Sequence, residues 1–254
     1  MRKTIGIVAE GPRDYDMIAS IIDSITGEEH NHLRIQPQPD ASGEFGNGWK
    51  GVWKWCETHQ DDLSDYFYSI SPKLDLLIIH MDGDVARKEK QVHCFCEPVD
   101  CDVRENVHPL KCERFIKKEC PIELPCPKHE ASPRGYATFL TAFLMKVSGE
   151  HGELPVCFLT PCDSTEAWIV AACEEREDYE TIEDPWEAVI CHSARYFGVK
   201  IKNRPNKNQG PYQELVSFVN RNWNTVMRRC PQAEAFNNEV IRHLVQKDSN
   251  EGSK

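Results

Sequence analysis

The sequence predicts an α/β fold in which a mainly parallel four-stranded sheet is flanked by helices. Four short candidate strands, the first an apolar run rich in β-branched residues, alternate with longer segments whose apolar residues recur at helical spacing. Such alternation is typical of strand–helix–strand units, which build a parallel sheet. We expect the strands at residues 3–9, 32–38, 74–81 and 154–161.

Apolar spacing also marks the helices between and after these strands. Ile18 and Ile21 lie three residues apart on one face of the first helix. In the segment "GYATFLTAFLMKVSG" the expected buried face includes Phe139 and Ala142. We expect helices at residues 10–25, 49–59, 135–149, 163–175, 186–197, 212–227 and 233–245.

Composition divides the chain of 254 residues into an α/β domain and an appendage. The α/β pattern covers residues 1–175, but a proline-rich and cysteine-rich insertion at 91–133 interrupts it. A helical C-terminal extension follows at 176–246. The polar tail at 247–254 is expected to be disordered.

The bulk composition is that of a water-soluble globular protein. Apolar residues make up 40% of the chain, and the mean hydropathy is -0.56. No apolar run is long enough to span a bilayer, and the N-terminus resembles a first strand more than a signal peptide, so we expect a cytoplasmic protein. A net charge of -11 argues against nucleic-acid binding by the whole surface, although a local basic track and bound cations remain compatible with a nuclease.

Acidic side chains follow two of the expected strands at the point where each strand ends. Glu10 follows the first strand, and Asp82 and Asp84 follow the third. Asp14 lies one helical turn after Glu10. Because the carboxyl ends of parallel strands share one edge of the sheet, these carboxylates can surround a divalent cation. A single acidic residue after a strand is more often a helix cap or a turn, but the combination favours a metal site.

Two segments resemble the signatures of the Toprim superfamily. "IVAEGPRDYDMIASII" matches its glutamate-glycine after the first strand, and "LLIIHMDGDV" matches its aspartate pair after a later strand. "LTPCDSTEAWIVAA" is similar to a segment of small stand-alone Toprim proteins, including RloB-like and OLD-type nucleases of prokaryotic defence loci. The resemblance covers roughly residues 3–90 and 134–175. It implies a Rossmann-like fold for the α/β domain.

The resemblance also implies roles for individual residues. Glu10, Asp82 and Asp84 would be catalytic, with Glu10 as metal ligand or proton acceptor and the two aspartates as ligands of Mg²⁺ or Mn²⁺. Asp14 matches an aspartate found in OLD-like members. Glu166 matches a later acidic position and would bind a second metal ion, but a capping-box glutamate is an equally good interpretation.

A metal-dependent nuclease that cleaves DNA or RNA is the function that this resemblance implies. No Walker loop and no tyrosine context typical of strand passage is present, so hydrolysis is favoured over rejoining. The acidic composition suggests that a partner, such as an ATPase of an anti-phage defence system, delivers the substrate. Two alternatives stay open: a non-catalytic, partner-binding Toprim subunit, and a hydrolase of nucleotides or other small phosphoesters. A homo-oligomer is compatible with each of them.

The insertion holds many of the chain's 12 cysteines. In a reducing compartment these are expected to be thiols or metal ligands rather than disulfides. Closely spaced pairs of thiolate and imidazole ligands are typical of structural zinc sites. The candidate zinc ligands are Cys94, Cys96, Cys126 and His129. An ordered loop with incidental thiols is the alternative.

Basic side chains that could contact a phosphate backbone lie in two places. The first group consists of residues just after the aspartate pair and one residue just before the helix at 135–149. We expect this group to lie nearer to the metal site. The other lies in the loop "VKIKNRPNKNQGPYQE", where a solvated loop is an equally good interpretation. The candidates are Arg87, Lys88, Lys90 and Arg134 in the first group, and Lys200, Lys202, Arg204 and Lys207 in the second.

Overall fold

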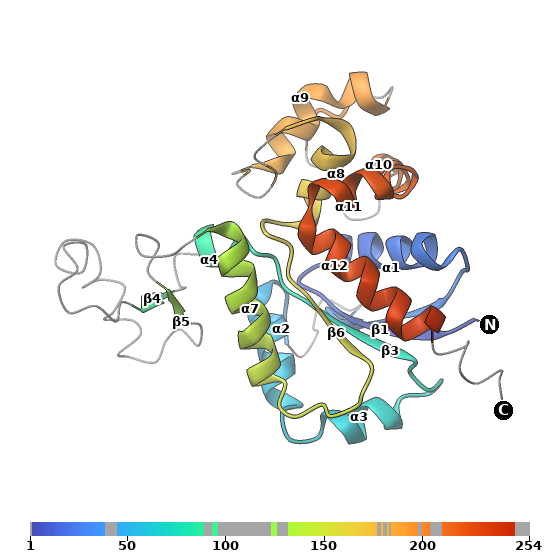
Figure 1. The fold of residues 1–254 in the computed structure, drawn as a ribbon, viewed down its shortest axis with the longest axis vertical. Coiled ribbons are helices and arrows are strands. Elements are labelled where there is room, and N and C mark those ends of the chain that lie inside the picture. Colours follow the sequence, from blue (N-terminus) through green and yellow to red (C-terminus); the bar gives the residue numbers. More distant parts are fainter. Residues whose placement is uncertain are drawn as a thin grey trace.

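A computed structural model of the chain confirms an α/β architecture with a four-stranded, all-parallel sheet (Figure 1). The strand order is β2-β1-β3-β6, and the strands are β1 (Thr4–Val8), β2 (Asn31–Gln36), β3 (Leu76–His80) and β6 (Val156–Leu159). The structure describes residues 2–38, 45–88, 93–95, 123–125, 132–176, 179, 182, 184–197, 200–203 and 210–246.

Helices cover both faces of the sheet (Figure 1). Alternate side chains of β3 pack on opposite faces of the sheet. Leu76 and Ile78 belong to one hydrophobic cluster, and Leu77 and Ile79 belong to the other. This division follows from the two-residue repeat of an extended strand that is buried on both faces. The helices of the two layers are α1 (Pro12–Thr26), α8 (Thr165–Cys173), α10 (Gly210–Arg221), α11 (Trp223–Arg229) and α12 (Pro231–Val240) on one side, and α2 (Trp49–Thr58), α3 (Leu63–Ser69) and α7 (Pro133–Val147) on the other.

The helices that follow α8 share the core of the α/β domain. Trp168 of α8 packs edge-on against Trp223 of α11, with ring centroids 5.4 Å apart, and also stacks near Phe236 of α12. The same cluster includes Ile18 of α1 and Ile78 of β3. Residues of the C-terminal extension therefore complete the hydrophobic layer over one face of the sheet. Helix α9 (Pro185–Phe197) lies against α8, and a π-helical segment, Ile241–Val245, continues α12.

Two expectations about helices were wrong. The segment 212–227 is not one helix, because α10 ends at Arg221 and Asn222 separates it from α11. The Asn222 side chain donates a hydrogen bond to the carbonyl of Phe218, and such side chain to backbone bonds compete with continuation of a helix. In α7 the buried side is a row that includes Tyr136 and Leu140, whereas Phe139 is 44% exposed and Ala142 is exposed as well.

Short helices and the insertion complete the description. The helix α3 was not expected from the sequence, nor was the single-turn helix α4 (Val85–Lys88) after the aspartate pair. In the segment 91–133, which was predicted to be an insertion, β4 (His93–Phe95) and β5 (Glu123–Pro125) pair in parallel. The other predicted features of residues 96–122 and 126–131, and the tail 247–254, lie outside the described residues. No helix in the described ranges is both long and apolar enough to cross a membrane.

Candidate metal centre

The carboxyl ends of β1 and β3 lie side by side, and this places Glu10 next to Asp82. The strands pair in parallel with Val8 opposite Ile79. The backbone N–H of Asp82 donates a hydrogen bond of 2.8 Å to Oε1 of Glu10. The second strand, β2, lies on one side of β1 in the sheet, and the third strand, β3, lies on the other side of β1. Such a reversal of strand order is where open α/β sheets form their sites.

The turn after β3 is held against the segment that follows β6. A Cβ atom on Gly83 would lie 2.1 Å from the carbonyl oxygen of Pro161 and 2.7 Å from that of Cys162, so only glycine permits this approach. The N–H of Asp84 donates to the carbonyl of Asp163 across 2.9 Å. The contact therefore brings the aspartate pair beside the beginning of α8.

Asp14 reaches the same place from the first turn of α1. Gly11 is the extended N-cap residue of this helix, and Pro12 occupies its first position, where the missing N–H is not needed. The Asp14 side chain is 7% exposed. The Thr165 hydroxyl at the start of α8 donates a 2.8 Å hydrogen bond to Oδ1 of Asp14. A bond between two helix starts thus fixes the orientation of the carboxylate.

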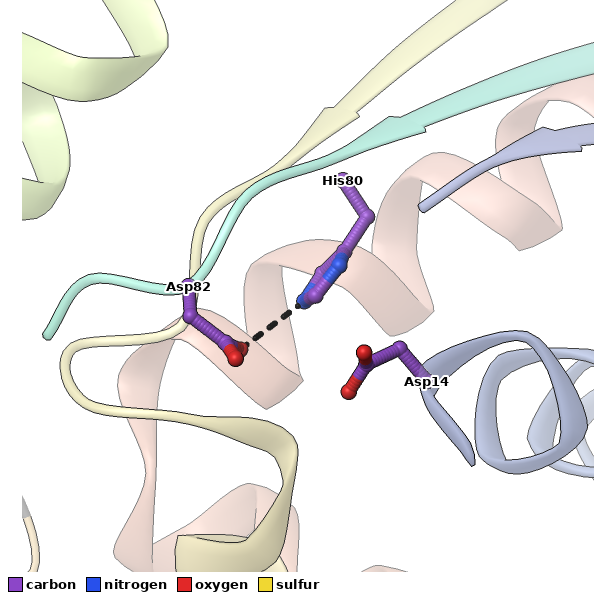
Figure 2. A group of neighbouring side chains, drawn as sticks. All are labelled: Asp14, His80 and Asp82. Carbon is purple, nitrogen blue, oxygen red and sulfur yellow. Dashed lines mark ion pairs between the residues drawn. The ribbon is translucent and has the colours of Figure 1, made fainter. Parts of the chain in front are cut away.

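His80, the last residue of β3, completes a group with Asp14 and Asp82. One ligand atom from each of the three side chains lies within 4.8 Å of the others, and Figure 2 shows the side chains pointing toward one another. Nε2 of His80 is 3.2 Å from Oδ1 of Asp82. This contact is close enough for an ion pair but is not aligned as a hydrogen bond. Both ring nitrogens and Oδ1 of Asp82 are consequently buried without a hydrogen-bond partner among the described residues.

Burial and the charges of neighbouring carboxylates raise the pKa values of Glu10, Asp82 and Glu166. For Glu10 the largest cause is burial, followed by the charge of Asp82. The pKa of Asp82 is also raised well above its ordinary value, first by burial and then by Asp14, Glu166, Asp84 and Asp163. Burial and Asp14 raise the pKa of Glu166. Carboxylates that are costly to ionise together become compatible when a divalent cation lies among them.

These observations show that the buried Asp14, His80 and Asp82 side chains could hold a metal ion. Two of the three were predicted from the sequence. Glu10 adjoins the group through its bond to the Asp82 backbone. Asp84 and Glu166 are near enough to raise the pKa of Asp82. Glu166 lies in the first turn of α8, as expected, and its side chain is buried there.

The structure describes the side chains of only three of the predicted basic residues and of none of the predicted zinc ligands. Arg134 is exposed in the first turn of α7, and Lys200 and Lys202 are exposed after α9. Only the backbone is described for Arg87 and Lys88 in α4 and for Cys94 in β4. The remaining predicted residues lie outside the described ranges; they are Lys90, Arg204, Lys207, Cys96, Cys126 and His129.

Several residues of the site were missed in the sequence. His80 precedes Asp82 by two positions, and that spacing points both side chains the same way in extended backbone, which was a usable signal. Arg13 adjoins Asp14, and its guanidinium lies 5.5 Å from the ring centroid of Trp186. The hydroxyl of Tyr212 in α10 donates to the carbonyl of Arg13 across 3.1 Å. No local pattern links Tyr212 with α1, because their contact depends on the packing of the C-terminal helices.

Comparison with known proteins adds no relative: no family model, no curated protein and no solved structure matches the chain. The class of protein that the fold and the site define is an α/β protein with a candidate metal centre at the switch point of its sheet.

Proposed function

We propose that this chain is a Toprim-type, metal-dependent nuclease that hydrolyses phosphodiester bonds of DNA or RNA. The observation that carries the proposal is the meeting of Asp14, His80 and Asp82 at the carboxyl edge of the sheet, with Glu10 bonded to the Asp82 backbone. These residues come from three separate elements, and the fold buries their charged groups despite the cost of doing so. The two sequence segments that resemble Toprim signatures supply residues of this group from the ends of β1 and β3.

The residues present fit a divalent cation such as Mn²⁺ or Mg²⁺, because two carboxylates offer oxygen lone pairs in one small space. The imidazole beside them has no hydrogen-bond partner among the described residues. Asp14, His80 and Asp82 would hold the first ion, and Asp84 and Glu166 are the candidate ligands for a second. A bound divalent cation would supply activation of water and stabilisation of charge on the phosphoryl oxygens.

Glu10 and Arg13 have roles that follow from their surroundings. Since burial raises the pKa of Glu10, its carboxylate is a stronger base than an exposed glutamate, as a proton acceptor for the attacking water requires. Arg13 provides positive charge beside Glu166. Its planar guanidinium matches phosphate geometry, so we assign Arg13 to positioning of the substrate phosphate.

The net charge of -11 also supports a second candidate, a hydrolase of nucleotides or small phosphoesters. A small anion needs only a local cation such as Arg13, whereas a long polyanion is repelled by the whole surface. If nucleic acid is the substrate, the same charge supports delivery by a partner. We retain the ATPase of a defence complex as the proposed partner.

The test is an incubation of the purified full-length chain with plasmid, single-stranded DNA, RNA and nucleotides, in Mn²⁺, Mg²⁺ or EDTA. We expect cleavage of a nucleic acid that requires a divalent cation and falls to background in Asp82→Asn. Asp61→Asn removes an equal charge from an exposed turn and should leave cleavage unchanged. Turnover of nucleotides alone would favour the second candidate. Equal cleavage by wild type and Asp82→Asn would overturn the assignment of the site.

A further inference from the structure

We propose that His80 is a metal ligand and that the site consequently takes a divalent transition metal, with Mn²⁺ as the ion to test, in preference to Mg²⁺. This inference rests on the metal site of the proposed function. It goes further by assigning the class of ion that the site prefers and by deriving that preference from the imidazole of His80. Its structural basis is the burial and orientation of the His80 ring beside Asp14 and Asp82 (Figure 2).

The first step concerns the hydrogen bonds that His80 does not make. The side chain is fully buried at the end of β3, and neither ring nitrogen has a hydrogen-bond partner among the described residues. A buried polar group left in this state costs about 1–3 kcal/mol. An apolar residue of similar size would avoid the cost at a position whose strand neighbours are Leu76–Ile79. A role for the ring in binding an ion accounts for its presence.

The second step concerns where the ring points. Nε2 lies 3.2 Å from Oδ1 of Asp82, and that oxygen also lacks a hydrogen-bond partner among the described residues. Asp14 completes the group from helix α1, and the hydrogen bond from Thr165 holds its carboxylate in place. Three lone-pair donors therefore face one space while two of them have nothing else to bind among the described residues.

The third step concerns the preference for an ion. Mg²⁺ takes oxygen ligands almost exclusively and keeps several waters, whereas first-row transition metal ions also accept imidazole nitrogen, Mn²⁺ the least strongly of them. One imidazole with two carboxylates therefore favours a transition metal over Mg²⁺. Mn²⁺ is the suitable probe because it accepts carboxylate and imidazole ligands but has little affinity for the thiolates of the cysteine-rich insertion.

The competing interpretation is that His80 is a protonated counter-charge for the acidic cluster. An imidazolium pairs with Asp82 at the same distance, but it has no lone pair to give to a metal ion. The two interpretations therefore differ in one measurable quantity, the magnetic coupling between a bound Mn²⁺ ion and a histidine nitrogen.

Pulsed electron paramagnetic resonance of the Mn²⁺-loaded, full-length protein measures this coupling as a modulation of the spin echo. We expect a ¹⁴N modulation in wild type that changes to the ¹⁵N pattern when histidine is isotopically labelled. It should disappear in His80→Gln, which offers oxygen in place of nitrogen, and in Asp82→Asn. His30→Gln replaces another buried histidine, which bonds to Thr26 near the amino end of β2, and should keep the modulation.

Competition between ions provides the second measurement. We expect Mn²⁺ to half-saturate wild type at a concentration at least about 10-fold below that of Mg²⁺, and His80→Gln to lose most of this preference. If Mn²⁺ binds wild type without nitrogen modulation, the role of His80 is overturned while the proposed metal site stands. If neither ion binds, the metal site of the proposed function falls as well. If His80→Gln does not fold, wild type without nitrogen modulation still overturns the role of His80, and loss of the modulation in Asp82→Asn still places the bound histidine at this site.

Discussion

The backbone N–H of Asp82 donates to Oε1 of Glu10 across 2.8 Å, and this bond connects the ends of two strands that are 72 residues apart in the chain. The Glu10 side chain therefore has a structural role in addition to its proposed role as a proton acceptor. The two roles can be separated by mutation, because the hydrogen bond needs only an acceptor oxygen, whereas proton transfer needs a basic carboxylate.

Glu10→Gln should keep the fold and lose activity. The amide oxygen of glutamine can accept the same hydrogen bond, but it is not a base, so cleavage should fall by about 100-fold or more. Glu10→Ala should in addition leave the Asp82 N–H unpaired, which lowers the free energy of unfolding by about 1–3 kcal/mol. Cleavage rates and urea unfolding of both variants test this. Full activity in Glu10→Gln would exclude Glu10 as the proton acceptor.

Thr165→Val should weaken metal binding by about 10- to 100-fold. The change removes the donor to Oδ1 of Asp14 while keeping a branched side chain of nearly the same volume, so the carboxylate loses its fixed orientation. Thr165→Ser retains a hydroxyl and should bind Mn²⁺ almost as wild type does. Calorimetric titration with Mn²⁺ measures both. Equal affinities in the valine and serine variants would show that the bond does not support the site.

The metal-free protein should become less stable as the pH rises above about 4. The pKa values of Glu10 and Asp82 are raised in the folded state, mainly by burial, so the folded protein binds protons more tightly than the unfolded chain. Their stabilising contribution is complete below the unfolded pKa values and is lost as the pH rises through the folded values. Thermal unfolding in EDTA across pH 4–9 measures the decline.

Mn²⁺ should reverse this trend, because a metal ion binds the deprotonated carboxylates. The increase in melting temperature on adding Mn²⁺ should therefore grow with pH over the same range. Asp82→Asn removes one of the raised groups, and in EDTA its melting temperature should fall less steeply with pH than that of wild type. A decline of the same slope in wild type and Asp82→Asn would show that ionisation of Asp82 does not cause the loss of stability.

The cysteine-rich insertion gives a separate metal prediction. If Cys94, Cys96, Cys126 and His129 bind structural zinc, purified protein should carry about one equivalent of zinc by elemental analysis. Replacement of Cys94 and Cys96 by serine should remove it. The His80→Gln variant serves as the control that excludes the candidate metal centre as its source. Protein that is free of zinc but folded would end the zinc proposal.

The sequence was sufficient to predict the sheet, because β1, β3 and β6 are short apolar runs between polar turns and the prolines after residue 36 marked the end of β2. Parallel pairing then implied that Glu10 and Asp82 would meet. Other features depend on tertiary contacts that no local pattern contains. The exposure of Phe139 is one example, because α7 carries apolar residues on several sides and packing against β6 and α2 decides which side is buried.

His80 shows a different limit of sequence reasoning. A histidine within an apolar run is compatible with an ordinary strand residue, and its meaning appears only when its nitrogens are found without partners among the described residues, next to two carboxylates. The break at Asn222 was missed because a single polar residue between two amphipathic segments is compatible with a continuous helix.

The close approach at Gly83 has a consequence for how this site would change over evolutionary time. No side chain beyond hydrogen fits there while the turn touches the backbone of Pro161 and Cys162. The adjacent Asp82 and Asp84 have no such steric restriction on replacement by smaller residues. On the proposed function, a descendant that abandons metal chemistry would lose its aspartates and keep its glycine, whereas one that retains it would keep all three. The residues at positions 82, 83 and 84 of related proteins would therefore distinguish those that retain the proposed metal chemistry from those that retain only the fold.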